Sequence, residues 1–286
     1  MPRTILAIHA HPDDEASKGA ATVAKYVAQG ARAVLVTATG GEAGEILNPA
    51  MDRPEVAENL AEIRAGELKK AAGIIGYGEV IMLGYRDSGM PNSEPNGHPD
   101  AFCRQPFDEV LERLVSIVRQ VRPDIVFGYD DHEFYPHPDH LLIHDLSLAL
   151  VRASADAQRF PESGEPWTIQ KLYAPIFSRE RISVLHEALL AETGESPFGP
   201  WLERLDGSQD LARKVTKIDV AGFIDQGREA LRAHRTQVDP DGFWFAVPTD
   251  FIESVYPWED FELLTSAVGW SEGETDLFDG VAETNE

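Results

Sequence analysis

The sequence has little of several features, and each scarcity excludes a class of protein. Cys103 is the only cysteine, so no internal disulfide can form. No apolar run approaches the roughly 20 residues that a membrane helix needs. The N-terminal stretch also lacks the apolar core and the small-residue cleavage site of a signal peptide. Together these features predict a cytoplasmic protein that does not span a membrane.

Positive charge is also scarce. The chain has 25 Lys and Arg against 49 Asp and Glu, a formal net charge of −24. Nucleic acids and anionic membranes both attract basic surfaces, so the composition argues against either as a partner. No GxGxxG motif is present, and a dinucleotide site is therefore not supported. The sequence is compatible with a homo-oligomer and does not specify one.

Strand patterns alternate with helix patterns in the first half of the chain. Short apolar runs predict strands, and longer segments with helical periodicity follow each of them. This order is typical of βαβ units. We therefore predict an α/β fold, with a Rossmann-like, mainly parallel sheet and helices on both faces. The predicted strands are 4–10, 32–39, 79–85 and 124–129, and the predicted helices are 16–29, 55–75, 106–121 and 139–153.

A polar link with Pro and Gly follows Ala153 and suggests a boundary. We predict a Rossmann-like core over 1–155 and a smaller C-terminal α/β portion over 156–268 that completes the sheet and the substrate pocket. Residues 269–286 are acidic and largely polar, which predicts a flexible tail. Within the C-terminal portion we expect a strand at 169–177, helices at 179–192 and 221–235, and a loop at 194–207.

The first group of chemically active side chains is His11-Pro12-Asp13-Asp14-Glu15. It falls where a predicted strand ends and a helix begins, and ligands of open α/β sheets gather at such strand ends. Pro12 fixes its own φ and shapes the turn. One Asp could simply cap the following helix. A cap explains neither His11 nor the second acid, so this segment indicates a functional site.

The second group is Tyr135-Pro136-His137-Pro138-Asp139-His140, which also follows a predicted strand and opens a helix. The two groups should therefore meet at the same edge of the sheet and can supply His, Asp and His to one metal. Three protein ligands with an open position are typical of catalytic zinc. The same set also suits non-haem Fe²⁺. Residues 1–155 thus become a metal-binding catalytic core, with Zn²⁺ expected and Fe²⁺ possible.

The remaining polar groups fit the hydrolysis of an amide. Such a reaction needs a carboxylate that takes a proton from water. It also needs a donor that meets the developing oxyanion and an acid that orients this donor. Asp13 or Asp14, His137 and Asp139 fit these roles by type. The residues leave open which of Asp13 and Asp14 is the ligand. A non-haem iron oxygenase is an alternative from another reaction class.

HAHPDDE at 9–15 and PHPDH at 136–140 resemble the LmbE/PIG-L family of zinc-dependent deacetylases. The resemblance covers nearly the whole chain. It implies that Asp13 is the general base. It also implies that the metal ligands are His11, Asp14 and His140.

The resemblance also assigns the residues that follow the second strand. It implies that His137 polarises the carbonyl or protonates the leaving amine, with Asp139 behind it. Tyr135 would be a mobile oxyanion donor. The chain departs from the family just before Tyr135, because residues 131–134 replace a Gly-rich Asn-Gly-Gly turn. This replacement adds bulk near the mouth of the site and bears on substrate preference.

Four further segments resemble one subgroup of the family, the mycothiol S-conjugate amidases. They are 17–21, 40–56, 86–90 and 233–248. The resemblance implies detoxification by hydrolysis of the amide between glucosaminyl-inositol and an S-substituted N-acetylcysteine, so the partner would be a small thiol-sugar conjugate. The alternative is an N-acetylglucosaminyl-inositol deacetylase, or a related amino-sugar deacetylase or tailoring amidase.

Five residues are candidates for substrate binding, and each has a simpler reading. Lys18 could be a solvated helix residue, and Arg64 could pair with Glu67 one turn on. Asp87 could form a turn with the residues after it. The family resemblance implies a sugar or inositol contact for Arg64 and a substrate contact for Lys18, whereas the loops after predicted strands favour Asp87, Glu45 and Asn48. The candidates are Lys18, Arg64, Asp87, Glu45 and Asn48.

Two histidines and an aromatic cluster have weaker assignments. His144 lies four residues after His140, a spacing that can bind metal. The other ligands already suffice, so we expect His144 to have a supporting or core role. His234 is expected to support or close the site. The aromatic residues 243–245 could line an apolar mouth or belong to the core.

Overall fold

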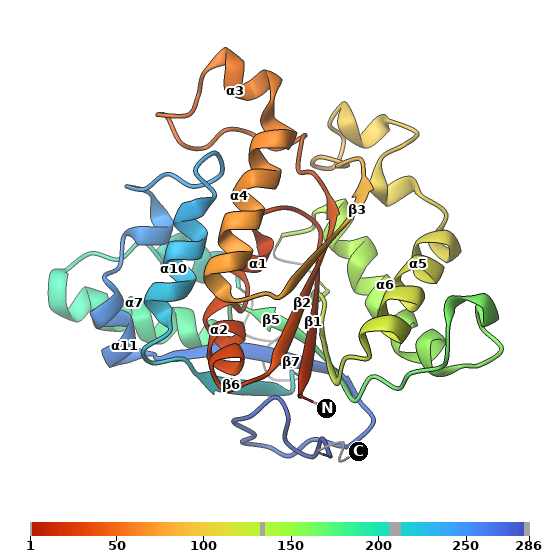
Figure 1. Ribbon diagram of the computed structural model, residues 1–286. Coiled ribbons are helices and arrows are strands. Elements are labelled where there is room, and N and C mark those ends of the chain that lie inside the picture. The colour runs from red at the N-terminus through yellow and green to blue at the C-terminus, as the bar shows by residue number, and fades with distance from the viewer. Residues whose placement is uncertain (1, 132–134, 206–212, 283–286) are drawn as a thin grey trace.

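A seven-stranded sheet forms the centre of the molecule (Figure 1). The computed structural model describes residues 2–131, 135–205 and 213–282. The strand order is β3-β2-β1-β4-β5-β7-β6; the first five are parallel, and β7 pairs antiparallel with β5 and β6. The strands are β1 (Thr4–His9), β2 (Arg32–Thr39), β3 (Glu79–Tyr85), β4 (Ile125–Phe127), β5 (Lys171–Ile176), β6 (Val215–Asp219) and β7 (Trp258–Ser266).

Helices cover both faces of the sheet. Helices α2, α4 and α10 pack on one face, and α5 and α6 pack on the other (Figure 1). This arrangement confirms the predicted fold class. The described α-helices are α1 (Asp14–Ser17), α2 (Ala20–Ala28), α3 (Pro54–Glu58), α4 (Leu60–Ile75), α5 (Phe107–Val121), α6 (Pro138–Ala155), α7 (Arg179–Thr193), α8 (Gly199–Arg204), α10 (Ile224–Ala233) and α11 (Thr249–Val255).

Strand β1 shows why the central strands read as continuous apolar runs. Successive side chains of a strand point to opposite faces of the sheet. Ile5 and Ala7 pack with α2, α4 and α10, whereas Leu6 and Ile8 pack with α5 and α6. All four side chains are fully buried. A parallel strand covered on both faces needs apolar residues at every position, which is the pattern found here.

Two predicted helices are interrupted in the structure. The predicted helix 16–29 divides at Gly19, which has φ +81° and leaves room for the ring of Phe261. A side chain at position 19 would be strained in this conformation. The predicted helix 55–75 divides at Asn59 into α3 and α4. Part of the loop expected at 194–207 forms the short helix α8. The predicted strands β1, β2 and β3 agree closely with the structure.

The C-terminal segment differs from its prediction. Leu277 and Phe278 are buried in the same core as Ile5, and Tyr26 donates a hydrogen bond of 2.7 Å to Asp276. The expectation of a flexible tail is therefore wrong for residues 269–282, because a few apolar side chains among the acids anchor the segment. Residues 283–286 lie outside the described part of the chain.

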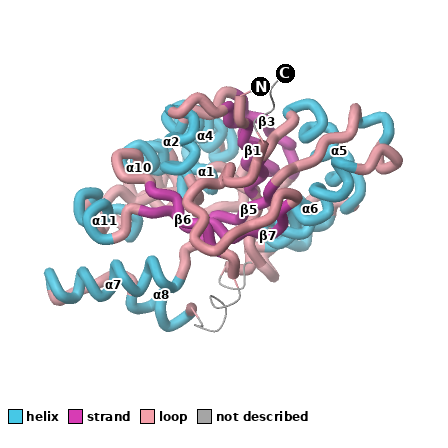
Figure 2. The backbone as a smooth tube through the Cα atoms, turned by 90° about the horizontal axis from the view of Figure 1, so that it is seen from below, coloured by secondary structure: helices cyan, strands magenta, loops and turns pink. Residues whose placement is uncertain are grey.

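The sheet continues across the boundary that was predicted near residue 155. Strand β5 pairs with β4, so the two portions share one sheet. Helices α7 and α8 project beside the sheet, where they form a third apolar cluster with residues near α11 (Figure 2). Within the described ranges, no helix has the length and apolar character that crossing a membrane would require.

Candidate active site

The turn after β1 carries the first motif in an unusual backbone conformation. Asp13 has φ +118°, which is rare for a residue with a side chain. Its backbone N–H donates to Glu15 Oε2 at 3.0 Å, and Glu15 Oε1 lies 2.5 Å from His234 Nε2. Glu15 and His234 are fully buried. This pair, which links the turn to the end of α10, therefore holds Asp13 in place.

Three atoms of metal-ligand type converge beside this turn. Asp14 Oδ2 lies 3.4 Å from His11 Nδ1 and 3.3 Å from His140 Nε2. The two imidazole nitrogens are 3.3 Å apart. Tetrahedral zinc bonds of about 2.0–2.1 Å place ligand atoms about 3.3–3.4 Å from one another. The trio His11, Asp14 and His140, which the family resemblance implies, therefore has a geometry that fits a divalent metal.

Other groupings of metal-binding side chains overlap this trio. Side chains of His11, Asp87, His137 and Asp139 also lie close enough to hold an ion, as do those of His11, His137 and His140. Asp139 and Asp87, however, approach Nε2 of His11, at 3.2 and 3.5 Å. Acids on the outer nitrogen of a ligating His orient the ring. An ion held by the trio would therefore lie on the Nδ1 side of His11, and Asp139 and Asp87 would orient the ring from its other nitrogen.

Asp14 is surrounded by hydrogen-bond donors. Its Oδ2 accepts from the Tyr129 hydroxyl at 2.7 Å, and its Oδ1 lies 2.5 Å from Lys18 Nζ. Burial alone would raise the pKa of Asp14, but Lys18 and His140 hold it well below its usual value. The carboxylate is thus ionised, as a metal ligand must be. Lys18, expected to contact substrate, lies on the pocket wall with its ammonium group on Asp14.

Tyr129 is a site residue that the sequence analysis missed. Besides Asp14, its hydroxyl contacts the backbone N–H of Ala10, which donates to it at 2.8 Å. Its ring stacks on His140 with centroids 4.3 Å apart and an interplanar angle of 13°. Tyr129 thus orients two of the three converging side chains, Asp14 and His140. The sequence did give one indication of its role. Tyr129 ends the predicted strand 124–129, which leads to the second motif.

Asp13 points to the pocket and not to the ligand trio. Its Oδ2 accepts from Arg64 Nη2 at 3.1 Å, and its side chain is 28% exposed. Burial raises the pKa of Asp13 above its usual value, while the positive charge of Arg64 opposes this rise. A carboxylate that lines the pocket and has a raised pKa is suited to accept a proton from water.

Arg64 is committed to protein groups. It donates to the carbonyl oxygens of Pro12 and Gly41, each at 2.5 Å, and is only 2% exposed. A Cβ at Gly41 would collide with its guanidinium group, so this glycine permits the close approach. Glu67, the alternative partner, instead accepts hydrogen bonds from Thr236. Arg64 therefore positions Asp13 and also borders the pocket, where the expected sugar contact stays a prediction.

We expect Arg64→Gln to move the acid side of the pH–rate profile to higher pH. The positive charge of Arg64 lowers the pKa of Asp13, so its loss raises that pKa. Asp13 must be deprotonated to act as a base. As the pH is lowered, the variant should therefore lose activity at a pH about one unit or more above that at which the wild type loses it. Arg64→Lys keeps the charge and is the matched control. Identical acid limbs of kcat/KM in the two variants would contradict this account.

His137 and Asp139 interact differently from the expectation. The Asp139 carboxylate accepts hydrogen bonds from the backbone N–H of Ser88 at 3.0 Å and from the Ser88 hydroxyl. It also bonds to His11 Nε2. It does not hydrogen-bond to His137, whose Nδ1 instead accepts the backbone N–H of Asp139 at 3.2 Å. The prediction that the Asp139 side chain orients His137 is therefore corrected; the partner of that side chain is His11.

This contact determines where His137 carries its proton. Because Nδ1 accepts a hydrogen bond, the ring proton of neutral His137 lies on Nε2. Burial and the neighbouring His11 lower the pKa of His137, which favours the neutral ring. His137 lines the pocket, so a neutral N–H donor faces it. Tyr135 is 47% exposed, and its ring centroid is 6.2 Å from that of His137. Residues 132–134, part of the altered turn, lie outside the described residues.

The remaining substrate candidates differ in position. Glu45 is exposed and lines the pocket. Asp87 also lines it, but its carboxylate accepts from the backbone of Gly89 at 2.8 Å and of Ala43 at 3.2 Å. Burial alone would raise the pKa of Asp87, but its interaction with the imidazole of His11 holds it far below its usual value. Asn48 is buried, accepts from the backbone of Ala50, and does not line the pocket, contrary to the prediction.

The pocket above the metal trio is large and has two unlike walls. Its volume is about 700 Å³. The loops after β2 and β3 supply one wall, with Glu45 and Asp87. The end of β5 and the C-terminal portion supply the other, with Phe177, Trp201 and Trp244. Apolar side chains also occur on the first wall and charged ones on the second, but the carboxylates of Glu45 and Asp87 lie on the first and the three aromatic rings on the second. Such a pocket can hold a molecule with a polyhydroxylated end and an apolar end.

Comparison with known proteins agrees with this geometry. A family described as PIG-L, GlcNAc-PI de-N-acetylase, matches residues 6–151, which include both motifs. A mycothiol S-conjugate amidase of Streptomyces coelicolor is 40% identical and covers 98% of this chain and 97% of its own. The chain belongs to the PIG-L family. Its resemblance to that family, inferred from the motifs, is confirmed.

Other PIG-L relatives carry a second activity. A 1D-myo-inositol 2-acetamido-2-deoxy-alpha-D-glucopyranoside deacetylase of Geodermatophilus obscurus is 38% identical over 98% of each chain. The solved N,N'-diacetylchitobiose deacetylase of Pyrococcus horikoshii has a TM-score of 0.61 at 20% identity, covers 92% of this chain and 84% of its own, and supports the fold. The protein is a hydrolase that acts on C–N bonds other than peptide bonds. An oxygenase is not supported.

Proposed function

We propose that the protein hydrolyses the amide that joins glucosaminyl-inositol to an S-substituted N-acetylcysteine. The two-sided pocket carries this proposal. An amide of this kind has a polyhydroxylated amine on one side and a substituted acyl group on the other. The polar wall with Glu45 and Asp87 suits the first, and the aromatic wall with Phe177, Trp201 and Trp244 suits the second. The 40% identity to a mycothiol S-conjugate amidase supports the same substrate.

His11, Asp14 and His140 would hold a divalent ion, with Zn²⁺ favoured by their N and O donors and Fe²⁺ possible. When bound, such an ion supplies a Lewis acid and acidifies water. Asp139 fixes the orientation of His11 through Nε2. Lys18 and Tyr129 keep the Asp14 carboxylate ionised and aligned.

Asp13 and His137 act on the substrate amide from the pocket wall. Asp13 takes a proton from the attacking water, whose oxygen bonds to the carbonyl carbon. The Nε2–H of His137 donates a hydrogen bond to the carbonyl oxygen as that oxygen gains charge. Asp13, protonated by the water, passes this proton to the amine nitrogen when the C–N bond breaks. The products are a free amine and a carboxylic acid. Exposed Tyr135 is placed to add a second donor.

Deacetylation of N-acetylglucosaminyl-inositol is the second candidate. The 38% identity to such a deacetylase favours it, as does the metal trio, which both reactions share. An acetyl group, however, is too small to use the aromatic wall of the pocket. We therefore rank this reaction below hydrolysis of the conjugate.

Competition between the two substrates tests this ranking. Equal amounts of a mycothiol S-conjugate and N-acetylglucosaminyl-inositol are mixed with limiting enzyme, and both products are followed. We expect the conjugate to be cleaved about tenfold faster or more, because burial of its apolar substituent adds binding that the acetyl sugar lacks. Chelated enzyme is the control for metal-dependent turnover. Preferential cleavage of the acetyl sugar would replace the amidase proposal by the deacetylase.

A further inference from the structure

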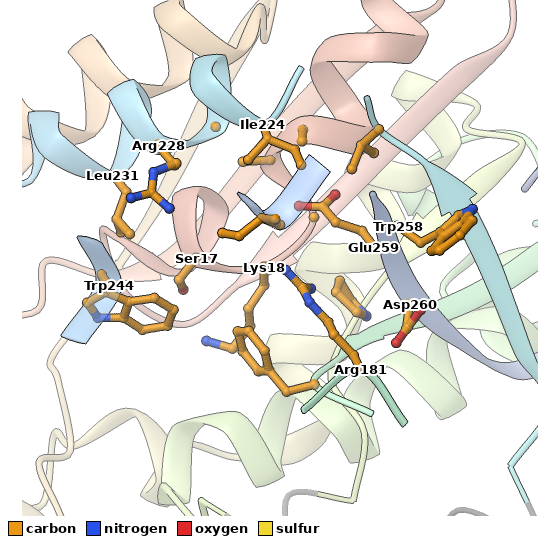
Figure 3. Close-up of a pocket in the computed structure, with 18 of the residues that line it drawn as sticks. Ser17, Lys18, Arg181, Ile224, Arg228, Leu231, Trp244, Trp258, Glu259 and Asp260 are labelled. Carbon is orange, nitrogen blue, oxygen red and sulfur yellow. The ribbon is translucent and has the colours of Figure 1, made fainter. Parts of the chain in front are cut away.

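A second cavity lies behind the aromatic wall of the catalytic pocket. Its volume is about 140 Å³, and we call it the side chamber. The two spaces share wall residues, among them Phe177, Trp201 and Trp244. Figure 3 shows the chamber, with Lys18 and Ser17 on the side of the turn after β1, which we call the metal turn. Its deeper lining is mostly apolar and comes from α7, α10, α11 and nearby loops: Ile182, Leu185, Phe198, Val220, Ile224, Val247 and Ile252.

The size of the side chamber corresponds to one aromatic ring. An engineered apolar protein cavity of about 150 Å³ takes up benzene. Both acids of the chamber have partners in the protein, whereas the buried Nε of Arg228 has no hydrogen-bond partner among the described residues. Glu259 accepts the backbone N–H of Thr22 at 2.8 Å, and Asp260 accepts from Tyr256 at 3.0 Å. An apolar guest of benzene size therefore fits the chamber without leaving these acids unpaired.

Two arginines favour an aromatic guest over an aliphatic one. Arg181 and Arg228 both line the chamber (Figure 3), and the guanidinium group of Arg228 lies 5.3 Å from the ring centroid of Phe245. A guanidinium group is attracted to the face of an aromatic ring. Arg181 already lies 5.7 Å from the ring centroid of Phe177. An aromatic ring in the chamber would meet both aromatic side chains and cationic groups, whereas an alkyl group would gain from burial alone.

The order of the strands gives the direction of the substrate. The metal turn follows β1, which is central in the sheet. Glu45 and Asp87 follow β2 and β3 on one side of it, whereas Phe177 follows β5 on the other. A substrate with its polyol at Glu45 and Asp87 and its amide at the metal trio must extend its acyl group toward Phe177. Phe177 is one of the residues that the side chamber shares with the catalytic pocket.

We propose that the side chamber binds an aromatic substituent of about benzene size on the sulfur of the acyl group. This inference rests on the proposed amidase function and adds the class of S-conjugate that the enzyme prefers. The aromatic substituent enters past Phe177 and Trp244, and the scissile amide stays at the metal trio.

Three mycothiol conjugates that differ only in the S-substituent test the proposal: S-methyl, S-cyclohexylmethyl and S-benzyl. We expect kcat/KM for S-benzyl to exceed that for S-methyl by about tenfold to a hundredfold, with S-cyclohexylmethyl between them. Ile224→Trp fills the chamber from α10 and should reduce the S-benzyl to S-methyl ratio at least about tenfold. Val247→Phe fills it from another side and should act in the same direction.

Leu190→Trp is the matched control, because Leu190 lies on α7 but is 43% exposed and outside the chamber. It should keep the wild-type ratio. If the wild type cleaves no conjugate, the proposed function fails and this inference fails with it. If it cleaves all three at similar kcat/KM, only the chamber assignment fails. A high S-benzyl ratio that survives in both chamber-filling variants would also overturn it.

Discussion

Asp13→Asn should lower kcat by about 10²–10⁴-fold while the protein keeps its metal, because the amide cannot accept a proton from water. Asp13 lines the pocket and lies outside the trio of converging ligand atoms. Asn is the suitable replacement because it tolerates the positive φ of this position better than Ala would. Its side-chain oxygen can still accept the hydrogen bond from Arg64.

Metal content and activity have to be measured on the same sample. Elemental analysis should give the same metal-to-protein ratio for Asp13→Asn and wild type, so that lost activity reflects lost proton transfer. Asp100→Asn, an exposed acid away from the pocket, is the control for the substitution itself. If Asp13→Asn released the metal and Asp14→Asn retained it, the assignments of base and ligand would be reversed.

His140→Ala should remove the metal and, with it, nearly all activity. His140 supplies one of three converging ligand atoms, and Asp14 and His11 alone leave an incomplete site. Loss of an outer hydrogen-bond partner typically costs a metal site about 10–100-fold in affinity, and loss of a ligand should cost more. Equilibrium titration with Zn²⁺ or Fe²⁺ in a metal buffer measures the effect for each ion.

His144→Ala provides the matched control on the same helix. His144 lies one turn after His140 on α6, but its Nδ1 bonds to the carbonyl oxygen of Tyr129 at 2.8 Å and is not part of the trio. This variant should bind metal with near wild-type affinity. Equal losses in the two variants would show that α6 had been disturbed as a whole, and full metal binding by His140→Ala would refute the trio.

The β1 to β4 half of the fold could be predicted because its signals are local. Buried parallel strands are continuous apolar runs, and each is followed by a helix of recognisable period. Strands β6 and β7 were missed for the opposite reason. Strand β7 carries Glu259, Asp260 and Glu262 between its apolar residues, and their partners lie far away in sequence, such as Thr22 and Arg213. Only the folded structure makes these acids compatible with a central strand.

The candidate site divides in the same way. A His, Asp and His metal site could be proposed from residue type and position at strand ends, but the choice of Asp14 over Asp13 came only from the family resemblance. The partners of Asp139 and Arg64 could not, because they depend on side-chain direction across segments far apart in the sequence. The resemblance implied the wrong partner for the Asp139 side chain, because two histidines lie near this residue. The backbone N–H of Asp139 donates to His137, whereas its carboxylate bonds to His11.

The packed C-terminal segment has a consequence for how the chain acquires its structure. Leu277, Phe278 and Val281 complete the core that begins with Ile5 and Ala7. Contacts between such distant positions form late and slow folding. During synthesis, the part of this core around Tyr26 therefore stays partly uncovered until residue 281 has emerged from the ribosome, because Phe278 packs against the Tyr26 ring. Until then, the growing chain exposes an apolar surface to other proteins and depends on its strong negative charge to stay apart from them.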